Sequence, residues 1–227
     1  MQNLNSYNEK TFQIEFEKTD TFLLLKQKYN RIFFKKFFEN EIISTYTPRH
    51  IHSLGESRIS AVPWYYLNYL DTSGLIVDIG CGVNFFKPFF KNLHGIGAED
   101  PLNTTGRHSF YGDEHGVVDD KFYQNHYGLF HSMFSINALH FQPLENLRNI
   151  CLNFCSMLKV GGRGFLTLNS ARLVEHSVYL KHLDGQLLDQ WIRNQFDDFP
   201  HKILVFDVDL FRKDAWMDGN IRIVFEN

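Results

Sequence analysis

The stretch that decides the fold is residues 75–83, Leu-Ile-Val-Asp-Ile-Gly-Cys-Gly-Val. Its first residues are apolar and mostly β-branched, as in a short strand that is buried on both faces. Gly80 and Gly82 follow, and glycine permits positive φ and lets backbone N–H groups approach a ligand closely. Asp78 lies near the carboxyl end of the expected strand, where open α/β sheets bind their ligands. The stretch therefore predicts a buried strand that leads into a ligand-binding glycine turn.

This glycine turn departs from the two common nucleotide-binding fingerprints. No Gly-Lys-Ser/Thr follows it, as a phosphate-binding loop requires, and Phe85 stands where GxGxxG has its third glycine. Residues 77–82, Val-Asp-Ile-Gly-Cys-Gly, instead resemble motif I of the class I S-adenosylmethionine-dependent methyltransferases. That family binds S-adenosyl-L-methionine and releases S-adenosyl-L-homocysteine. The resemblance implies that four residues contribute to the cofactor site: Asp78, Gly80, Cys81 and Gly82.

Composition sets broad limits on the function. The 227 residues suffice for one substantial core, and 44% apolar with 22% charged residues is ordinary for a soluble globular protein. A net charge of −3 argues mildly against broad binding of nucleic acid. The first ten residues lack a signal-peptide pattern, and no apolar run reaches the roughly 20 residues that span a bilayer. We expect a cytoplasmic protein without a membrane span.

The chain is expected to divide near residue 70. Residues 1–70 are predicted to form an N-terminal helical cap, and residues 71–227 the S-adenosylmethionine-binding domain. A basic amphipathic pattern covers residues 22–43 and favours a helix that packs on the main domain over one that lies on a membrane. In the family that the chain resembles, the segment upstream of motif I forms one wall of the cofactor site. Arg58 is then a candidate partner for the cofactor's carboxylate, although a surface arginine fits the pattern equally well.

Acidic residues after the glycine turn are further candidates for cofactor contacts. Residues 85–93 look helical, and residues 93–101 predict a second strand that ends in Glu99 and Asp100. Glu99 follows Gly80 by 19 residues, close to the spacing at which Rossmann-type sites place a ribose-binding carboxylate. The third strand is expected in residues 109–113 or 115–120. The family usually has an adenine-binding polar residue there, and Asp113 and Asp119 both qualify.

The second half of the chain continues the alternation of strands and helices. Residues 127–136 predict a fourth strand, and the following Asn137 falls in a region that resembles the family's motif IV, beside the transferred methyl group. A helix is expected from Pro143 to Leu158. The next residues, Leu-Lys-Val-Gly-Gly, resemble the family's Leu-Lys-Pro-Gly-Gly turn, with glycines 161 and 162 ending the helix. Two last strands are expected within residues 202–211 and 221–225.

Alternating helices and strands predict an α/β fold with a largely parallel sheet. The resemblance, which covers about residues 75–225, implies more: a Rossmann-like methyltransferase fold with a seven-stranded, mostly parallel sheet. The last strand is then antiparallel, and helices cover both faces of the sheet.

Methyl transfer from a sulfonium demands little of the protein besides alignment and exclusion of water. A general base is needed only where the acceptor keeps its proton, and His140, just after the fourth strand, is the best candidate for one. A capping or packing role fits His140 equally well. No metal site is expected, because His50 and His52 lack further ligands. Cys151 and Cys155 fit buried core thiols better than a metal site.

Three functions compete at this stage. The leading one is a methyltransferase for a small-molecule acceptor, because no Asp/Asn-Pro-Pro-Tyr/Phe string, typical of amino-methylating nucleic-acid enzymes, follows the fourth strand. A protein or RNA methyltransferase is the second, and the basic residues between Lys26 and Lys36 are its only support. The third is a non-catalytic binding protein that keeps the fold. The sequence does not specify the acceptor or the oligomeric state.

Overall fold

The computed structural model describes residues 9–20, 22–23, 61–81, 86, 89–97, 110–111, 120–139, 143–208 and 220–227. The chain divides into two compact units, Met1–Asn68 and Tyr69–Asn227. In the first unit, α1 (Glu9–Phe16) packs on α5 (Ala61–Leu67) through aromatic rings. Phe16 stacks on Trp64 with ring centroids 5.5 Å apart, and Phe12 meets Tyr65 edge-on. Pro63 falls in the first turn of α5, where a missing N–H costs no helical hydrogen bond.

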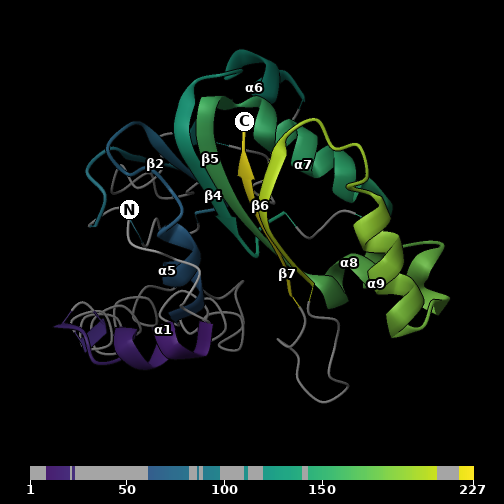
Figure 1. Ribbon diagram of the computed structural model, residues 1–227. Helices are drawn as coiled ribbons and strands as arrows, with labels where there is room; N and C mark the ends of the chain where they lie inside the picture. The colour runs from purple at the N-terminus through teal and green to yellow at the C-terminus, as the bar shows by residue number, and fades with distance from the viewer. Residues whose placement is uncertain are drawn as a thin grey trace, which may run out of the picture. The chain divides into compact units, whose positions relative to one another are not determined.

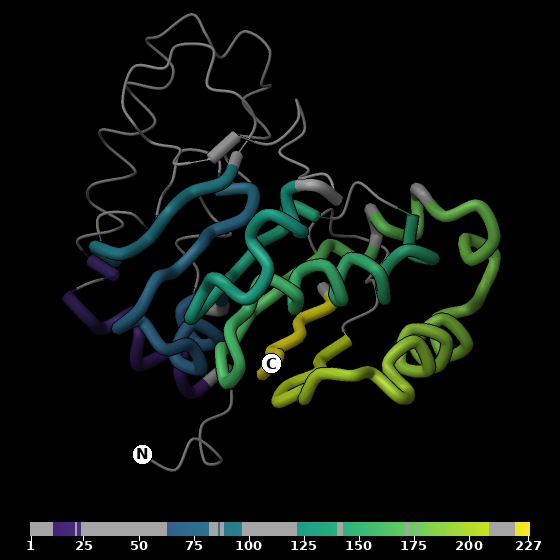
Figure 2. Tube along the Cα trace, turned by 90° about the horizontal axis from the view of Figure 1, so that it is seen from above, coloured from purple at the N-terminus to yellow at the C-terminus, as the bar shows by residue number. Residues whose placement is uncertain are grey.

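The second unit is built on one seven-stranded sheet with the order β3-β2-β1-β4-β5-β7-β6. The first five strands in chain order pair in parallel, whereas β7 is antiparallel to both of its neighbours, β5 and β6. Figure 2 shows the yellow β7 alongside the green β5. The strands are β1 (Ile76–Ile79), β2 (Leu93–Gly97), β3 (Phe110–Tyr111), β4 (Phe130–Ile136), β5 (Leu158–Asn169), β6 (Lys202–Val208) and β7 (Asn220–Glu226). This arrangement confirms the predicted α/β fold with a seven-stranded, mostly parallel sheet. Helices on both faces of the sheet stay a prediction, because the described helices of this unit pack on one face.

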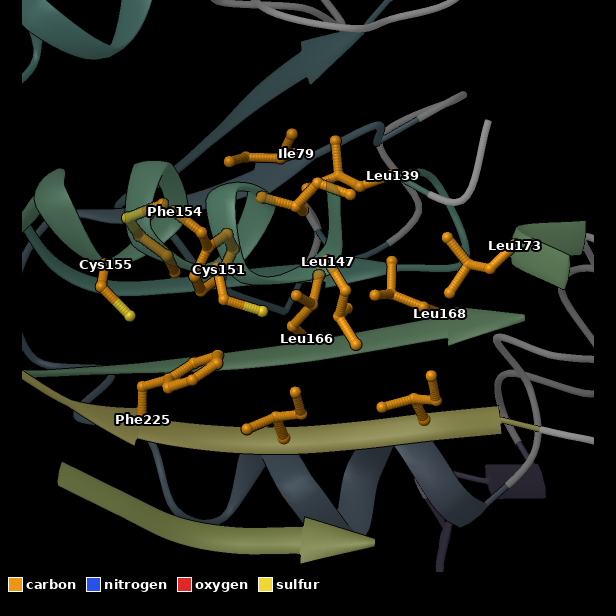
Figure 3. Packing of buried hydrophobic residues seen from close by; sticks show 14 of the residues in the cluster. Ile79, Leu139, Leu147, Cys151, Phe154, Cys155, Leu166, Leu168, Leu173 and Phe225 are labelled. Carbon is orange, nitrogen blue, oxygen red and sulfur yellow. The ribbon is translucent and has the colours of Figure 1, made fainter. Parts of the chain in front are cut away.

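Helices of the second unit gather on one face of this sheet (Figure 1). They include α6 (Asp120–Asn125), α7 (Leu147–Ser156), α8 (Ser170–His176) and α9 (Gly185–Asn194), with short 3-10 turns η4 (Leu144–Asn146) and η5 (Leu180–His182). Figure 3 shows Phe154 and Leu147 of α7 directed toward Leu166 of β5 and Phe225 of β7. All four side chains are fully buried. Cys151 and Cys155 lie in the same cluster, and burial raises the pKa of both thiols, so they are the core thiols predicted.

The opposite face of the sheet carries more polar groups. The strand register puts Asp78 of β1 next to Phe134 of β4, and Phe134 next to Phe165 of β5. Phe86, from the segment after β1, meets Phe134 edge-on with ring centroids 5.3 Å apart. Further along β5, Thr167 pairs with Arg222 of β7. This face therefore buries aromatic rings beside a carboxylate and a hydroxyl, unlike the apolar cluster under α7.

Two local predictions are wrong. Phe86 and Phe89 lie in turns rather than in a helix, with the Phe89 N–H donating to the Phe86 carbonyl (2.9 Å). The helix predicted from Pro143 to Leu158 is present as η4 and α7, but it ends at Ser156, so Gly161 ends no helix.

Gly161 and Gly162 instead lie inside β5, next to an irregularity in its pairing with β4. Gly161 has φ +74° and donates its N–H to Asn227, while a Cβ on Gly162 would lie 2.8 Å from the Lys159 carbonyl oxygen. The glycines bend the long strand β5 where it bulges.

Candidate functional site

The connections of the parallel strands identify one edge of the sheet as a ligand site. The chain leaves β1 toward β2 and β3 on one side, and it resumes with β4 and β5 on the other side. The strand order therefore reverses between β1 and β4. Ligands of open α/β sheets bind outside the carboxyl ends of the strands at such a switch point. The residues that follow β1 and β4 here are Gly80 and Cys81 on one strand, and Asn137 and Ala138 on the other.

Gly80 is required at this edge by its backbone and by its neighbour. Its φ is +72°, a region that side chains with a Cβ disfavour. A Cβ built on Gly80 would lie 2.0 Å from the Cβ of Ala138. A second link ties the two strand ends together, because the Ser135 hydroxyl donates to the Ile79 carbonyl oxygen at 2.9 Å. The ends of β1 and β4 therefore meet in close contact, with glycine and alanine at the meeting point.

The backbone donors of the glycine turn are used within the protein. The N–H groups of Gly80 and Cys81 both donate to the carbonyl oxygen of Ile96 in β2, at 2.7 and 2.8 Å. The expectation that glycine frees backbone N–H groups for a ligand therefore does not hold for these two residues. They fix the turn against β2, and the Cys81 side chain is fully buried. Gly82 lies outside the described residues.

Asp78 is the buried carboxyl group of the site. It is the third residue of β1, is fully buried and has Gly95 and Phe134 as its neighbours in the sheet. Aspartate is seldom fully buried in proteins, so its place two residues before the glycine turn distinguishes this end of the strand. The structure places Asp78 and Gly80 at the same edge, as predicted, and leaves their role in binding a prediction.

Asn137 directly follows β4 and adopts a left-handed conformation, with φ +52°. Its backbone N–H donates to the Thr167 carbonyl oxygen at 2.9 Å. The Thr167 hydroxyl in turn donates to the Oδ1 of Asn137, with 3.5 Å between the two oxygens. Thr167 is nearly buried and Asn137 is half-buried. β5 therefore holds both the backbone and the side chain of Asn137 at the switch point.

A second polar group follows β4 a few residues further along. Glu145 of η4 accepts hydrogen bonds from the Ser177 hydroxyl and from the Tyr179 N–H, the latter at 3.1 Å. Burial alone raises the pKa of Glu145, but the hydrogen bonds from Ser177 and from backbone N–H groups prevail and lower it. The Ser177 hydroxyl also accepts from the Leu180 N–H at 2.9 Å. This network anchors the segment between α8 and η5 to the start of η4.

Several predicted site residues lie outside the described residues, and their roles stay predictions. They are Arg58, Gly82, Glu99, Asp100, Asp113, the alternative Asp119, and His140. For the third strand, β3 lies within residues 109–113, the first of the two segments proposed.

Sequence reasoning missed the contributions of Ala138, Thr167 and the Ile96 carbonyl. Each is an ordinary residue in the sequence and acquires its role by meeting a residue from a distant strand. The pairing of β4 with β5 would have been the signal for Thr167, because it places that residue beside the end of β4.

Within the described ranges, no group of three or more His, Cys, Asp or Glu residues is arranged to hold a metal ion. Among the helices that are described, none has the length and apolar character needed to cross a bilayer.

No family model and no curated protein matches this chain. Solved structures do resemble it. An antibiotic-resistance methyltransferase, Kmr, is 14% identical, with 68% of this chain and 87% of that chain covered and a TM-score of 0.44. A SAM-dependent methyltransferase from Archaeoglobus fulgidus is 14% identical, with coverage of 74% and 92% and a TM-score of 0.45.

A third similar structure is the 1,6-didemethyltoxoflavin-N1-methyltransferase of Burkholderia thailandensis, with 1,6-didemethyltoxoflavin and S-adenosylhomocysteine bound. It is 12% identical, with 68% of this chain and 71% of that chain covered and a TM-score of 0.41. The strand order of its own sheet identifies the fold of this protein. The order in which the parallel strands follow one another reverses between β1 and β4, and β7 is antiparallel to its neighbours.

Proposed function

We propose that this protein is an S-adenosylmethionine-dependent methyltransferase that acts on a small-molecule acceptor. One observation carries the proposal: the motif-I-like glycine turn, Gly80 with φ +72°, lies at the carboxyl end of β1, at the switch point of the sheet. The strand order agrees with the fold that the resemblance implies. The sequence resemblance and the ligand-binding edge of the sheet therefore coincide at the same residues.

Among the described residues, it is the backbone conformation at Gly80, with its positive φ, that fits this cofactor. A Cβ on Gly80 would fill the space where β1 and β4 meet, so only glycine allows this junction at the edge where a ligand binds. When bound, S-adenosylmethionine supplies a methyl group that the sulfonium has already activated. Asp78 would then place a buried carboxyl group beside the turn, while the Gly80 and Cys81 N–H groups fix the turn to the Ile96 carbonyl oxygen. Asn137 lines the end of β4, on the side expected for the acceptor.

The roles predicted for Arg58, Glu99, Asp100, Asp113 and His140 belong to this proposal, as does the cytoplasmic location. Arg58 would bind the methionine carboxylate, Glu99 or Asp100 the ribose, and Asp113 the adenine. His140 would act as a base only for an acceptor that keeps its proton. In the same proposal, residues 1–70 form a cap that selects the acceptor, and residues 71–227 bind the cofactor.

Calorimetric titration with S-adenosylmethionine and S-adenosylhomocysteine tests the proposal directly. We expect micromolar affinity for both in the wild type, and at least tenfold weaker binding in Asp78→Asn, which keeps the shape of the buried side chain but removes its charge. Gly128→Ala is the matched control, because Gly128 has φ +61° and open space around it, at the amino end of β4. It should bind like the wild type.

The alternatives give different results in this experiment. If the folded wild type binds neither compound, the methyltransferase proposal is wrong. Binding without turnover on any acceptor class would favour the non-catalytic binding protein. The basic residues from Lys26 to Lys36, which support a protein or RNA substrate, lie outside the described residues. Methylation of bulk RNA or protein, but of no small molecule, would favour that alternative.

A further inference from the structure

The contact between Thr167 and Asn137 determines which atoms of the Asn137 amide remain for a ligand. A side-chain amide has one accepting oxygen and one NH₂ group with two donors. In the structure, the oxygen, Oδ1, faces the Thr167 hydroxyl on β5. The backbone N–H of Asn137 is also bound to β5, at the Thr167 carbonyl oxygen. The NH₂ group is therefore the end of the amide turned away from β5.

The same residue lies at the proposed reaction centre. Asn137 precedes Ala138, whose Cβ contacts Gly80, so it stands beside the glycine turn at the switch point. Its side chain is half-buried, whereas that of Thr167 is 6% exposed. The NH₂ group is thus the part of this half-buried side chain that does not contact Thr167, and a nearly buried hydroxyl contacts the oxygen of the same amide.

We propose that Thr167 is a positioning residue, which turns the Asn137 amide so that its NH₂ group donates to the methyl acceptor. The acceptor atom must then offer a lone pair and carry no hydrogen toward Asn137. An anionic oxygen, as in a carboxylate or a phenolate, meets this requirement best, because a hydrogen bond to the charged form favours that form. An amine that points its own N–H groups at Asn137 is disfavoured. This inference rests on the proposed function and specifies its substrate class.

The transfer to such an acceptor balances without a further reactant. The anionic oxygen uses a lone pair to form a bond to the methyl carbon. The carbon–sulfur bond breaks, and its electron pair remains on sulfur, which becomes a neutral thioether. The oxygen loses its negative charge and the sulfur its positive charge, so no proton is removed in the step. A general base such as His140 is then not required.

The orientation can be tested without knowing the acceptor. Sinefungin is an analogue of S-adenosylmethionine in which a carbon bearing an amine replaces the methylated sulfur. Its ammonium group thus occupies the position of the transferred methyl group. We would measure the Kd of sinefungin and of S-adenosylhomocysteine by calorimetry and compare the ratio of the two constants among variants. A change that only destabilises the protein alters both constants together and leaves this ratio unchanged.

Three variants distinguish the roles. Asn137→Asp replaces the donors with a carboxylate, and we expect the ratio to shift at least tenfold toward sinefungin, as for a charge-assisted hydrogen bond. Thr167→Val removes the hydroxyl at nearly constant shape and lets the amide turn its oxygen toward the ammonium, so we expect a shift of about threefold or more in the same direction. Thr167→Ser keeps the hydroxyl and should restore the wild-type ratio within about twofold.

Each other result overturns the inference in a distinguishable way. An unchanged ratio in Asn137→Asp would mean that Asn137 does not face the methyl position. A shift in Asn137→Asp but none in Thr167→Val would mean that Thr167 does not orient the amide. Failure of the folded wild type to bind S-adenosylhomocysteine would instead remove the proposed function itself. Circular dichroism and melting temperatures of all variants show whether each is folded.

Discussion

Hydrogen bonds from side chains join the amino ends of β1 and β4 to neighbouring segments, whereas the first residue beyond the carboxyl end of each strand adopts a left-handed conformation. On the amino side, the Leu75 N–H donates to His131 Nδ1 at 3.0 Å, and the Ser132 hydroxyl donates to the Asp71 carbonyl oxygen at 2.6 Å. On the carboxyl side, Gly80 and Asn137 have φ of +72° and +52°.

The two ends of the strands thus differ in construction. Near the amino ends, Arg163 of β5 and Lys202 of β6 both bind Glu226 of β7. At the carboxyl ends, Asn137 keeps a left-handed conformation, which a residue with a side chain holds only where the surrounding structure fixes it, as is common at functional sites. This difference agrees with the proposal that the ligand binds at the carboxyl ends.

The largest expected effect is at the carboxyl edge. Gly80→Ala introduces a Cβ that overlaps that of Ala138, in addition to the cost of a positive φ. We expect a loss of about 2–5 kcal/mol in the free energy of unfolding, from overpacking and backbone conformation together. Denaturant unfolding measures this value.

Two further variants separate those causes. Gly128→Ala has a positive φ but open space, so it should lose only about 1–2 kcal/mol. Adding Ala138→Gly to Gly80→Ala should recover the overpacking part. If Gly80→Ala and Gly128→Ala were equally destabilising, the contact between the strand ends would not be tight.

The amino edge offers the corresponding test. A Cβ on Gly74 would lie 2.2 Å from Cγ of the His131 ring, which packs over that glycine. Gly74→Ala should therefore displace the ring, break its bond with the Leu75 N–H and cost about 1–3 kcal/mol. In a double-mutant cycle with His131→Ala, measured by urea unfolding, the two changes should be clearly non-additive. If the two losses of unfolding free energy simply added, a Cβ at Gly74 would not displace the His131 ring.

A smaller effect is expected from backbone conformation at Asn137. Asn137→Gly and Asn137→Ala both remove the contact with the Thr167 hydroxyl, so they differ only in the backbone. Asn137→Ala should be about 1 kcal/mol less stable than Asn137→Gly, because glycine accepts a positive φ readily and alanine does not. Thermal unfolding of the two variants provides the comparison. Equal stabilities would mean that the end of β4 is not held in the left-handed region.

The smallest effect concerns the ion pairs of the amino edge. Hydrogen bonds from Lys202 and Arg163 lower the pKa of Glu226 below its ordinary value of 4.5. The carboxylate therefore stabilises the folded state above that value, and this contribution is lost as the pH falls from 4.5 through the lower folded-state pKa.

Glu226→Gln should accordingly lose a few tenths of a kcal/mol at pH 7 and less at pH 3, because partly exposed ion pairs contribute little. Unfolding free energies at the two pH values check this expectation. A penalty that grew toward pH 3 would contradict it. Asp189→Asn, which removes an exposed partner of Arg193 within α9, is a matched control outside the sheet.

The sequence predicted those features that depend on nearby residues. The apolar run of β1, the turn at Gly80 after it and the buried face of α7 are local patterns, and each appears where it was expected. Predictions were wrong where a distant partner competes with the local pattern. Gly161 resembles a helix stop in the sequence, but it lies in β5, because β5 pairs with β4 from Leu158 onward and the Gly161 N–H bonds to Asn227.

The sequence by itself determined the alternation of helices and strands, the sheet class and the place of the glycine turn. These follow from periodicity and from the conformational freedom of glycine, which act over a few residues. Only the tertiary structure decided that Ile96 receives the N–H groups of the turn, that Ala138 meets Gly80 and that Thr167 contacts Asn137. Each of these contacts joins separate strands or their ends, and strand order and register, rather than local pattern, bring them together.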